Sequence, residues 1–215
     1  MVLLLHLRKK SVTLNYSNMT RIKQLIEKEI AAIQRIPITD SFEDAIQRIY
    51  NSVHLNGGKV VAAGIGKAGH IAHNIAMTLA STGTRAVFVH PTEAQHGDIG
   101  ILAENDILLI LSNSGKTREA LELIELSRRI YPNITVIGIT GNPDSELGIK
   151  SDIVIGTGAG EEIDRFKLVP TTSTTLMTVI GDVLVVSLME KINFTKEHYH
   201  LLHHSGYIGK KLANS

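Results

Sequence analysis

The sequence predicts an α/β fold in which helices cover both faces of a parallel sheet, and three observations carry this prediction. Five short apolar runs lack the alternation of a half-exposed strand, which is typical of strands buried on both faces. Segments with apolar residues at helical spacing lie between several of these runs. A glycine-rich turn follows the first run and opens a helix, so strands and helices alternate along the chain.

Length and composition indicate an ordinary globular protein. The chain has 215 residues, 43% of them apolar and 20% charged, with a net charge of +1 and no cysteine. This charge gives no reason to expect a nucleic-acid partner, and a chain without cysteine has no disulfides, which fits the cytoplasm. With no run of about 18 apolar residues, we expect no membrane-spanning segment. We expect residues 1–17 to form a flexible tail and residues 18–215 a single domain.

Two helices are expected before the first strand. Thr20 can cap the first, and Asp40 or Ser41 can cap the second. Gly57-Gly58 then breaks the chain into the alternating part, whose crossovers should be right-handed. The expected helices are 20–33, 42–53, 71–79, 119–130 and 174–190, and the expected strands are 59–63, 87–89, 107–111, 135–139 and 153–155.

Between the first strand and its helix lies the turn Gly64-Ile65-Gly66-Lys67-Ala68-Gly69-His70. Such a turn leaves backbone N–H groups unpaired at the positive end of the helix dipole, which suits a phosphate, and Lys67 adds a positive charge. Its three glycines also match the dinucleotide fingerprint, with Glu93 near the distance of a ribose-binding acid. The turn alone leaves three roles open: a dinucleotide site, another phosphate site, or a merely structural turn.

A second polar loop, Ser112-Asn113-Ser114-Gly115-Lys116-Thr117, follows the third strand. Hydroxyls, N–H donors and the dipole of the next helix all suit a phosphate. Helix capping is the alternative, but a cap needs one hydroxyl and this loop offers three. More hydroxyls that could bind a phosphate lie before the last long helix, in the run Pro170-Thr171-Thr172-Ser173-Thr174-Thr175. Helix capping is an equal alternative there.

Carboxylates and histidines near the same strand ends supply groups for acid–base chemistry. Glu162 lies in a glycine-rich loop that has little structural use for it, although Glu161 beside it leaves the assignment open. Glu119 fits either a site or a first-turn acid that faces the helix dipole. His96 follows a loop and lies outside any apolar stripe.

Four histidines, His198, His200, His203 and His204, crowd a short segment near the end of the chain. His200 and His204 are four residues apart, a spacing at which two side chains on one helix face can share a metal. A polar interface or the edge of an active site is the favoured interpretation, and we expect no metal site.

Taken together, these loops resemble the sugar isomerase (SIS) domain family and, within it, the arabinose-5-phosphate isomerases. The resemblance covers nearly the whole chain beyond the tail, and the segments that carry it are 64–70, 80–84, 89–98, 112–115 and 170–175. It implies a three-layer α-β-α sandwich around a five-stranded parallel sheet, a phosphosugar held by the serine loop, and no cofactor, which sets the dinucleotide aside. The implied reaction interconverts D-ribulose 5-phosphate and D-arabinose 5-phosphate on the route to Kdo, an acid sugar of lipopolysaccharide and capsules.

The resemblance also implies roles for individual residues. Glu162 would be the base, Lys67 would stabilise developing negative charge, and Glu119 would orient Lys67 or a substrate hydroxyl. His203 would move protons on the sugar oxygens, and a second family histidine falls on His96. The substrate would be held by Gly66, Ser112, Asn113, Ser114, Thr117, Thr171, Thr172 and Ser173.

The chain departs from the family pattern at two places, at His203-His204-Ser205-Gly206 and around Glu161 to Arg165. The sugar preference is therefore open, and an isomerase for a different phosphosugar is one alternative. A phosphosugar sensor without turnover is another, although a sensor needs the anchor and not the acid–base set.

The resemblance also implies partners. We expect a homotetramer with sites at subunit interfaces, where His203 reaches a neighbouring subunit. Many relatives carry a regulatory pair of CBS domains that we expect this chain to lack. Feedback by a downstream Kdo or CMP-Kdo-type product would then act on this domain itself.

Overall fold

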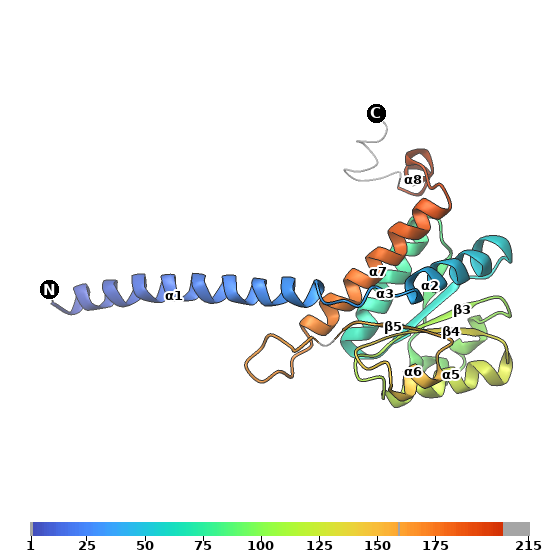
Figure 1. Ribbon diagram of the computed structural model, residues 1–215, viewed down its shortest axis with the longest axis horizontal. Coiled ribbons are helices and arrows are strands. Elements are labelled where there is room, and N and C mark those ends of the chain that lie inside the picture. Colours follow the sequence, from blue (N-terminus) through green and yellow to red (C-terminus); the bar gives the residue numbers. More distant parts are fainter. Residues whose placement is uncertain (1, 159, 204–215) are drawn as a thin grey trace.

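The structure, a computed structural model, describes residues 2–158 and 160–203. A sheet of five parallel strands in the order β2-β1-β3-β4-β5 forms its centre (Figure 1). Every strand overlaps its predicted range, so the predicted α/β class and parallel sheet are confirmed. The strands are β1 Val60–Gly64, β2 Ala86–Phe88, β3 Ile107–Leu111, β4 Thr135–Thr140 and β5 Ile153–Gly156.

Helices cover both faces of this sheet. The elements are α1 Val2–Ile33, α2 Ser41–Ile49, α3 Gly66–Ser81, α4 Pro91–Ala94, α5 Arg118–Ile130, α6 Glu146–Lys150, α7 Thr172–Lys191 and α8 Lys196–Leu202, with a π-helical segment η1 Tyr50–Leu55 and a 3-10 segment η2 Asp98–Ile101. The short elements α4, η2, α6 and α8 were not expected. Each has too few residues to show a helical period in its apolar side chains.

The start of the first helix differs from the prediction. Thr20 is not its cap, because α1 begins at Val2. No proline or glycine interrupts residues 2–33, so nothing in the sequence stops the helix. Residues 2–17, expected as a flexible tail, form the part of α1 that extends away from the sheet (Figure 1). The division into a tail and a single domain stays a prediction.

The second predicted helix is also altered at both ends. Asp40 occupies the N-cap position of α2, but its side chain makes no capping hydrogen bond. At the other end, α2 continues directly into η1, so the helical path runs to Leu55.

Successive residues of each inner strand face opposite layers. Along β1, Val60 and Ala62 belong to the core under α2, α3 and α7, whereas Val61 and Ala63 belong to the core under α4, α5 and α6. Both faces of the strand are therefore apolar, which explains the absence of alternation in the sequence. The result is the expected three-layer α-β-α sandwich.

The chain changes direction across the sheet between β1 and β3. From β1 the path crosses to β2 on one side, and from β3 it crosses to β4 and β5 on the other. The carboxyl ends of β1 and β3 are neighbours, with Gly64 paired to Leu111. The helices that follow, α3 and α5, lie on opposite faces. Loops diverge at such a point and leave a crevice, where open parallel sheets bind their ligands.

Helix α7 corrects the expectation that no segment is apolar enough to span a membrane. Among the described residues, Thr172–Lys191 is the one helix that is long and apolar enough to cross a membrane by length and composition, with a mean hydropathy of 1.6. Half of this window is buried inside the domain. Leu176, Ile180 and Leu184 lie in the core beneath α3. These contacts account for the apolar composition, since a helix between other core elements has few exposed positions.

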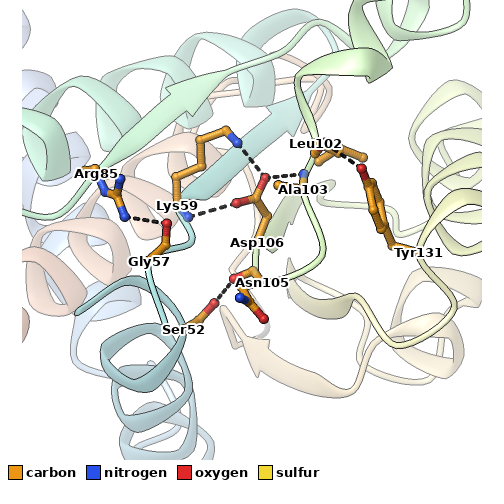
Figure 2. Close-up of polar contacts among 9 residues, drawn as sticks. All are labelled: Ser52, Gly57, Lys59, Arg85, Leu102, Ala103, Asn105, Asp106 and Tyr131. Atoms are coloured by element: carbon orange, nitrogen blue, oxygen red, sulfur yellow. Dashed lines mark hydrogen bonds and ion pairs between the residues drawn. The ribbon is translucent and has the colours of Figure 1, made fainter. Parts of the chain in front are cut away.

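Asp106 joins several segments at the amino edge of the sheet (Figure 2). Its carboxylate accepts hydrogen bonds from the backbone N–H of Lys59 at 2.9 Å and from that of Ala103 at 2.8 Å. The Lys59 ammonium pairs with it at 2.6 Å, and the Asp106 side chain is 1% exposed. Nearby, Ser52 donates to the carbonyl of Asn105. The starts of β1 and β3 are therefore held together by a buried charge whose partners are all supplied by the protein.

Asp106→Asn should lower the free energy of unfolding by about 1–3 kcal/mol, because the buried amide would turn its own hydrogens toward N–H donors that the carboxylate accepts from. Urea unfolding measures this loss. The matched control is Glu43→Gln, which breaks the Lys191–Glu43 pair of 3.3 Å, where the Glu43 side chain is 70% exposed. That change should cost less than about 1 kcal/mol. Equal losses in the two variants would contradict this account of Asp106.

Candidate active site

A cavity of about 380 Å³ lies at the carboxyl edge of the sheet. Its walls come from the glycine turn, the serine loop, the loop after β5 and the first turns of α7. The lining residues are Lys67, Ala68, Ser112, Asn113, Ser114, Thr117, Glu162, Lys167, Leu168, Pro170, Ser173, Thr174 and Met177. The crevice at the strand switch point thus collects most of the predicted substrate-binding residues.

The glycine turn places Lys67 on the cavity wall. Gly66, the first residue of α3, has φ +60°, a conformation that favours glycine. A Cβ at Gly69 would lie 2.5 Å from the carbonyl oxygen of Gly64, so α3 can approach β1 only with glycine there. The glycine spacing therefore has a packing reason and needs no dinucleotide. Lys67 is exposed and forms no ion pair with any residue in the described part of the chain.

Hydroxyls of the serine loop bind one another and the loop backbone. Ser112 Oγ lies 2.8 Å from Thr117 Oγ1 and accepts from the N–H of Gly115 at 3.1 Å. Ser114 Oγ accepts from the N–H of Lys116 at 3.2 Å. Thr117 is the N-cap residue of α5, yet its side chain makes no capping bond. The capping alternative is therefore not realised, and these hydroxyls fix the shape of the loop.

That shape leaves backbone donors free. Within residues 2–158 and 160–203, the N–H groups of Asn113, Ser114 and Thr117 have no hydrogen-bond partner. Unpaired N–H groups at the start of a helix form a site for an anion, where the helix dipole adds to the attraction. The loop therefore has the donors that a phosphate requires.

Glu162 faces the cavity from the loop after β5, and donors surround its carboxylate. Oε2 accepts from the N–H of Thr171 at 2.7 Å, from Thr171 Oγ1 at 3.0 Å and from the N–H of Ser173 at 3.3 Å. Oε1 accepts from the Ser173 hydroxyl. Burial raises the pKa of Glu162, but the hydrogen bonds from Ser173 and Thr171 outweigh it, so the pKa lies below its ordinary value. Glu162 is therefore ionised at neutral pH.

The SIS domain family model matches residues 55–187, which include β1, the serine loop and Glu162. The chain belongs to the SIS domain family.

Several relatives within this family are close. The arabinose 5-phosphate isomerase KdsD of Pseudomonas aeruginosa is 44% identical over 155 residues, which cover 72% of this chain and 47% of the relative. A Bacteroides fragilis protein, described as a candidate phosphosugar isomerase of capsule formation, is 52% identical with a TM-score of 0.86, over 88% of this chain and 98% of that one. An Escherichia coli protein, c3406, solved in complex with arabinose 5-phosphate, is 34% identical with a TM-score of 0.82 over the same shares. The chain spans about half the length of the curated relatives it matches.

Two residues expected to bind substrate, Thr171 and Thr172, do not line the cavity and use their hydroxyls within the protein. Thr171 donates to Glu162, as described above, and does not line the cavity. Thr172 is fully buried, and its hydroxyl donates to Glu29 Oε1 of α1 at 3.0 Å. Both therefore hold the start of α7 in place, a role that the threonine-rich sequence cannot distinguish from ligand binding. Gly66 does not line the cavity either, although the next residue does.

Three of the predicted catalytic side chains lie outside the cavity: Glu119, His96 and His203. Glu119 is the second residue of α5, partly exposed, and has no hydrogen bond or ion pair to any described residue. The expected contact with Lys67 is therefore not made. His96 is exposed between α4 and η2. Glu119 lies in the first turn of α5 and His96 in a loop, and neither contributes to the cavity wall.

His203 lies far from this cavity and beyond the residues that the family model matches. The cavity includes the first turns of α7, whereas α8 follows the opposite end of that helix (Figure 1). The 20 residues of α7 span roughly 30 Å. The His203 ring stacks on Tyr199 with centroids 4.0 Å apart, and its Nδ1 lies 3.0 Å from the Tyr199 carbonyl oxygen. Since a carbonyl only accepts, Nδ1 carries the hydrogen, and Nε2 has no hydrogen-bond partner among the described residues. His204, which follows His200 by four residues, lies outside the described residues.

Lys167 is the charged residue of the cavity lining that sequence reasoning missed. Its ammonium lies 2.8 Å from Glu161 Oε1, and the side chain also borders the cavity. The cavity lining also distinguishes the two neighbouring glutamates. Glu162 lines the cavity, whereas Glu161 does not and pairs with Lys167. A single lysine in an irregular loop has no period or motif that could have marked it.

Proposed function

We propose that the protein is an aldose–ketose isomerase that interconverts D-ribulose 5-phosphate and D-arabinose 5-phosphate in Kdo biosynthesis. One observation carries the proposal: the carboxylate of Glu162 and the ammonium of Lys67 line one cavity with an anion-binding serine loop. The names of the curated relatives and the arabinose 5-phosphate bound to the Escherichia coli protein support the choice of substrate.

The reaction needs an anchor, a base and a group that stabilises an oxyanion. The serine loop holds the phosphate. Glu162 removes the proton from C2 of arabinose 5-phosphate while O1 of the carbonyl is protonated, which gives an enediol. The proton then returns to C1 as O2 loses its own, which gives ribulose 5-phosphate. Lys67 stabilises the negative charge that develops on the two oxygens. His203 moves the protons between these oxygens.

Incubation with ribulose 5-phosphate, followed by NMR, tests this activity. Appearance of arabinose 5-phosphate supports the proposal. Conversion of a hexose or heptose phosphate instead would show an isomerase with a different sugar preference. Binding of phosphosugars without any turnover would show a sensor, an outcome that the presence of both Lys67 and Glu162 in the cavity lining disfavours.

Ser114→Ala tests the anchor. The exposed hydroxyl is free to donate to a phosphate, and a hydrogen bond to a charged group contributes about 1.5–3 kcal/mol, so KM should rise about tenfold or more. The melting temperature should change little, because the hydrogen bond that Ser114 accepts from Lys116 is exposed. Ser112→Ala is the comparison: its buried hydroxyl shapes the loop, so it should lower the melting temperature as well. An unchanged KM in Ser114→Ala would put the phosphate elsewhere.

The proposal extends to a homotetramer whose sites include a neighbouring subunit. Four apolar side chains of α1, Met19, Ile22, Ile26 and Ile30, are each at least half exposed and recur at helical spacing. Such a stripe is typical of a helix that packs against another copy. The distance of His203 from its own cavity also favours a site shared between subunits. Light scattering of the purified protein measures the oligomeric state.

A cytoplasmic location and product feedback complete the proposal. A downstream Kdo or CMP-Kdo-type product would occupy the same cavity as an inhibitor. Calorimetry with each product tests this, and absence of binding at millimolar concentration would remove the idea.

A further inference from the structure

Lys167 is held in a conformation that a lysine rarely adopts. Its φ of +56° lies in the left-handed region, where a side chain is unfavourable and glycine is preferred. Strain of this kind persists only where the surroundings impose it, and it occurs often at ligand-binding positions. Because Lys167 also lines the cavity, its strained backbone points to a use for its side chain there.

Asp164 imposes this conformation. Its Oδ1 accepts from the N–H of Phe166 at 2.7 Å, and its Oδ2 accepts from those of Leu168 at 2.9 Å and Val169 at 2.8 Å. The N–H of Lys167 donates to the Asp164 carbonyl at 3.1 Å. The Asp164 carboxylate thus holds the loop in a tight turn that places Lys167 in the cavity lining.

The ammonium of Lys167 has a weak partner. The Glu161 and Lys167 side chains are 74% and 60% exposed, and pairs at that exposure contribute little to stability. An adjoining hollow of about 270 Å³ contains the same pair together with Lys28 and Arg35. These two cations compete with Lys167 for Glu161. The ammonium can therefore leave Glu161 at little cost when a stronger anion arrives.

The charges around the cavity favour such an exchange. The charged side chains among its described lining residues are Lys67, Lys167 and Glu162. A phosphate monoester carries about −1.5 to −2 near pH 7. Lys67 is balanced by Glu162, so without Lys167 the phosphate would face no net positive charge. We propose that Lys167 leaves Glu161 on binding and pairs with the phosphate of the ligand, as a second cation beside Lys67. The inference rests on the proposed function for the class of ligand, a phosphosugar.

Calorimetry with arabinose 5-phosphate, and separately with inorganic phosphate, tests this on four variants. Lys167→Gly removes the charge at a position whose backbone suits glycine, and should raise Kd about tenfold for both ligands. Lys167→Arg keeps the charge and should restore affinity. Glu161→Gln removes the competing anion and should lower Kd by about two- to threefold. Lys23→Ala removes an exposed cation of α1 that pairs with Glu27 and lines neither hollow, and should leave Kd unchanged.

The proposal predicts that Lys167→Gly raises Kd and that Glu161→Gln lowers it. If the ion pair were only structural, both variants would change Kd in the same direction. The proposal is overturned by an unchanged Kd in Lys167→Gly or by a Kd in Glu161→Gln that is not lowered. It fails separately from the proposed function: a wild-type protein that binds these ligands without isomerising them counts against the isomerase alone.

Discussion

Glu162→Gln should lower kcat by at least about 10²-fold, because general acid–base catalysis typically contributes about 10²–10⁴-fold and an amide takes no proton at neutral pH. Exchange of the substrate C2 hydrogen with deuterated water should fall in step. Glu161→Gln is the comparison, since Glu161 lies outside the cavity. This variant should lower KM, because Lys167 is released for the ligand, and should leave kcat near that of the wild type. If exchange were lost in Glu161→Gln and kept in Glu162→Gln, the two neighbours would have exchanged roles.

The contacts of Glu162 add a second effect to this variant. Its carboxylate accepts from Thr171 and Ser173 at the start of α7, where negative charge is favourable. A glutamine would turn its amide hydrogens toward some of these donors. We therefore expect a lower melting temperature and some rise in KM, in addition to the loss of kcat.

The stability effect should depend on pH with a defined sign. Because the folded-state pKa of Glu162 is lowered from its ordinary value of 4.5, its contribution is fully present above that value and is lost as the pH falls through the folded-state pKa. Glutamine does not titrate. The difference in unfolding free energy between wild type and Glu162→Gln should be constant near neutral pH and shrink below about pH 4.5. A difference that grows on acidification would contradict the assigned hydrogen bonds.

The sheet could be predicted from the sequence because its strands are buried on both faces. Ile107 to Leu111 is apolar at every position, so the run marks the strand without any knowledge of its neighbours. The glycine turn and the serine loop followed from strand order, since parallel strands end at one edge. The roles of Thr171 and Thr172 could not follow, because hydroxyl groups serve a ligand, a carboxylate or a helix start equally well. Lys167 depends on a turn fixed by Asp164, a contact that has no sequence period.

His203 shows the limit of reasoning on one chain. Its place in the family pattern predicts a catalytic role, yet the whole length of α7 separates it from Lys67 and Glu162. A helix of that length, packed along α3 in the core, does not bend to close the gap. Either His203 takes part in no active site, or it takes part in the active site of another copy of the chain.

Mixing two inactive variants decides between these. Lys67→Met and His203→Asn should each lower kcat by at least about 10²-fold alone. After unfolding and refolding together, half of the interfaces pair unlike chains. In each such pair one site combines the intact Lys67 of one chain with the intact His203 of the other, so the mixture should recover roughly a quarter of the wild-type activity.

Recovery requires that the two residues come from different subunits. If both served the cavity of their own chain, every chain in the mixture would still lack one of them, and activity would stay at the level of the single variants. Lys67→Met mixed with Glu162→Gln is the matched control, because these two residues line one cavity within a chain. That mixture should recover nothing, so recovery in the first mixture and none in the second would assign His203 to the neighbouring subunit's site.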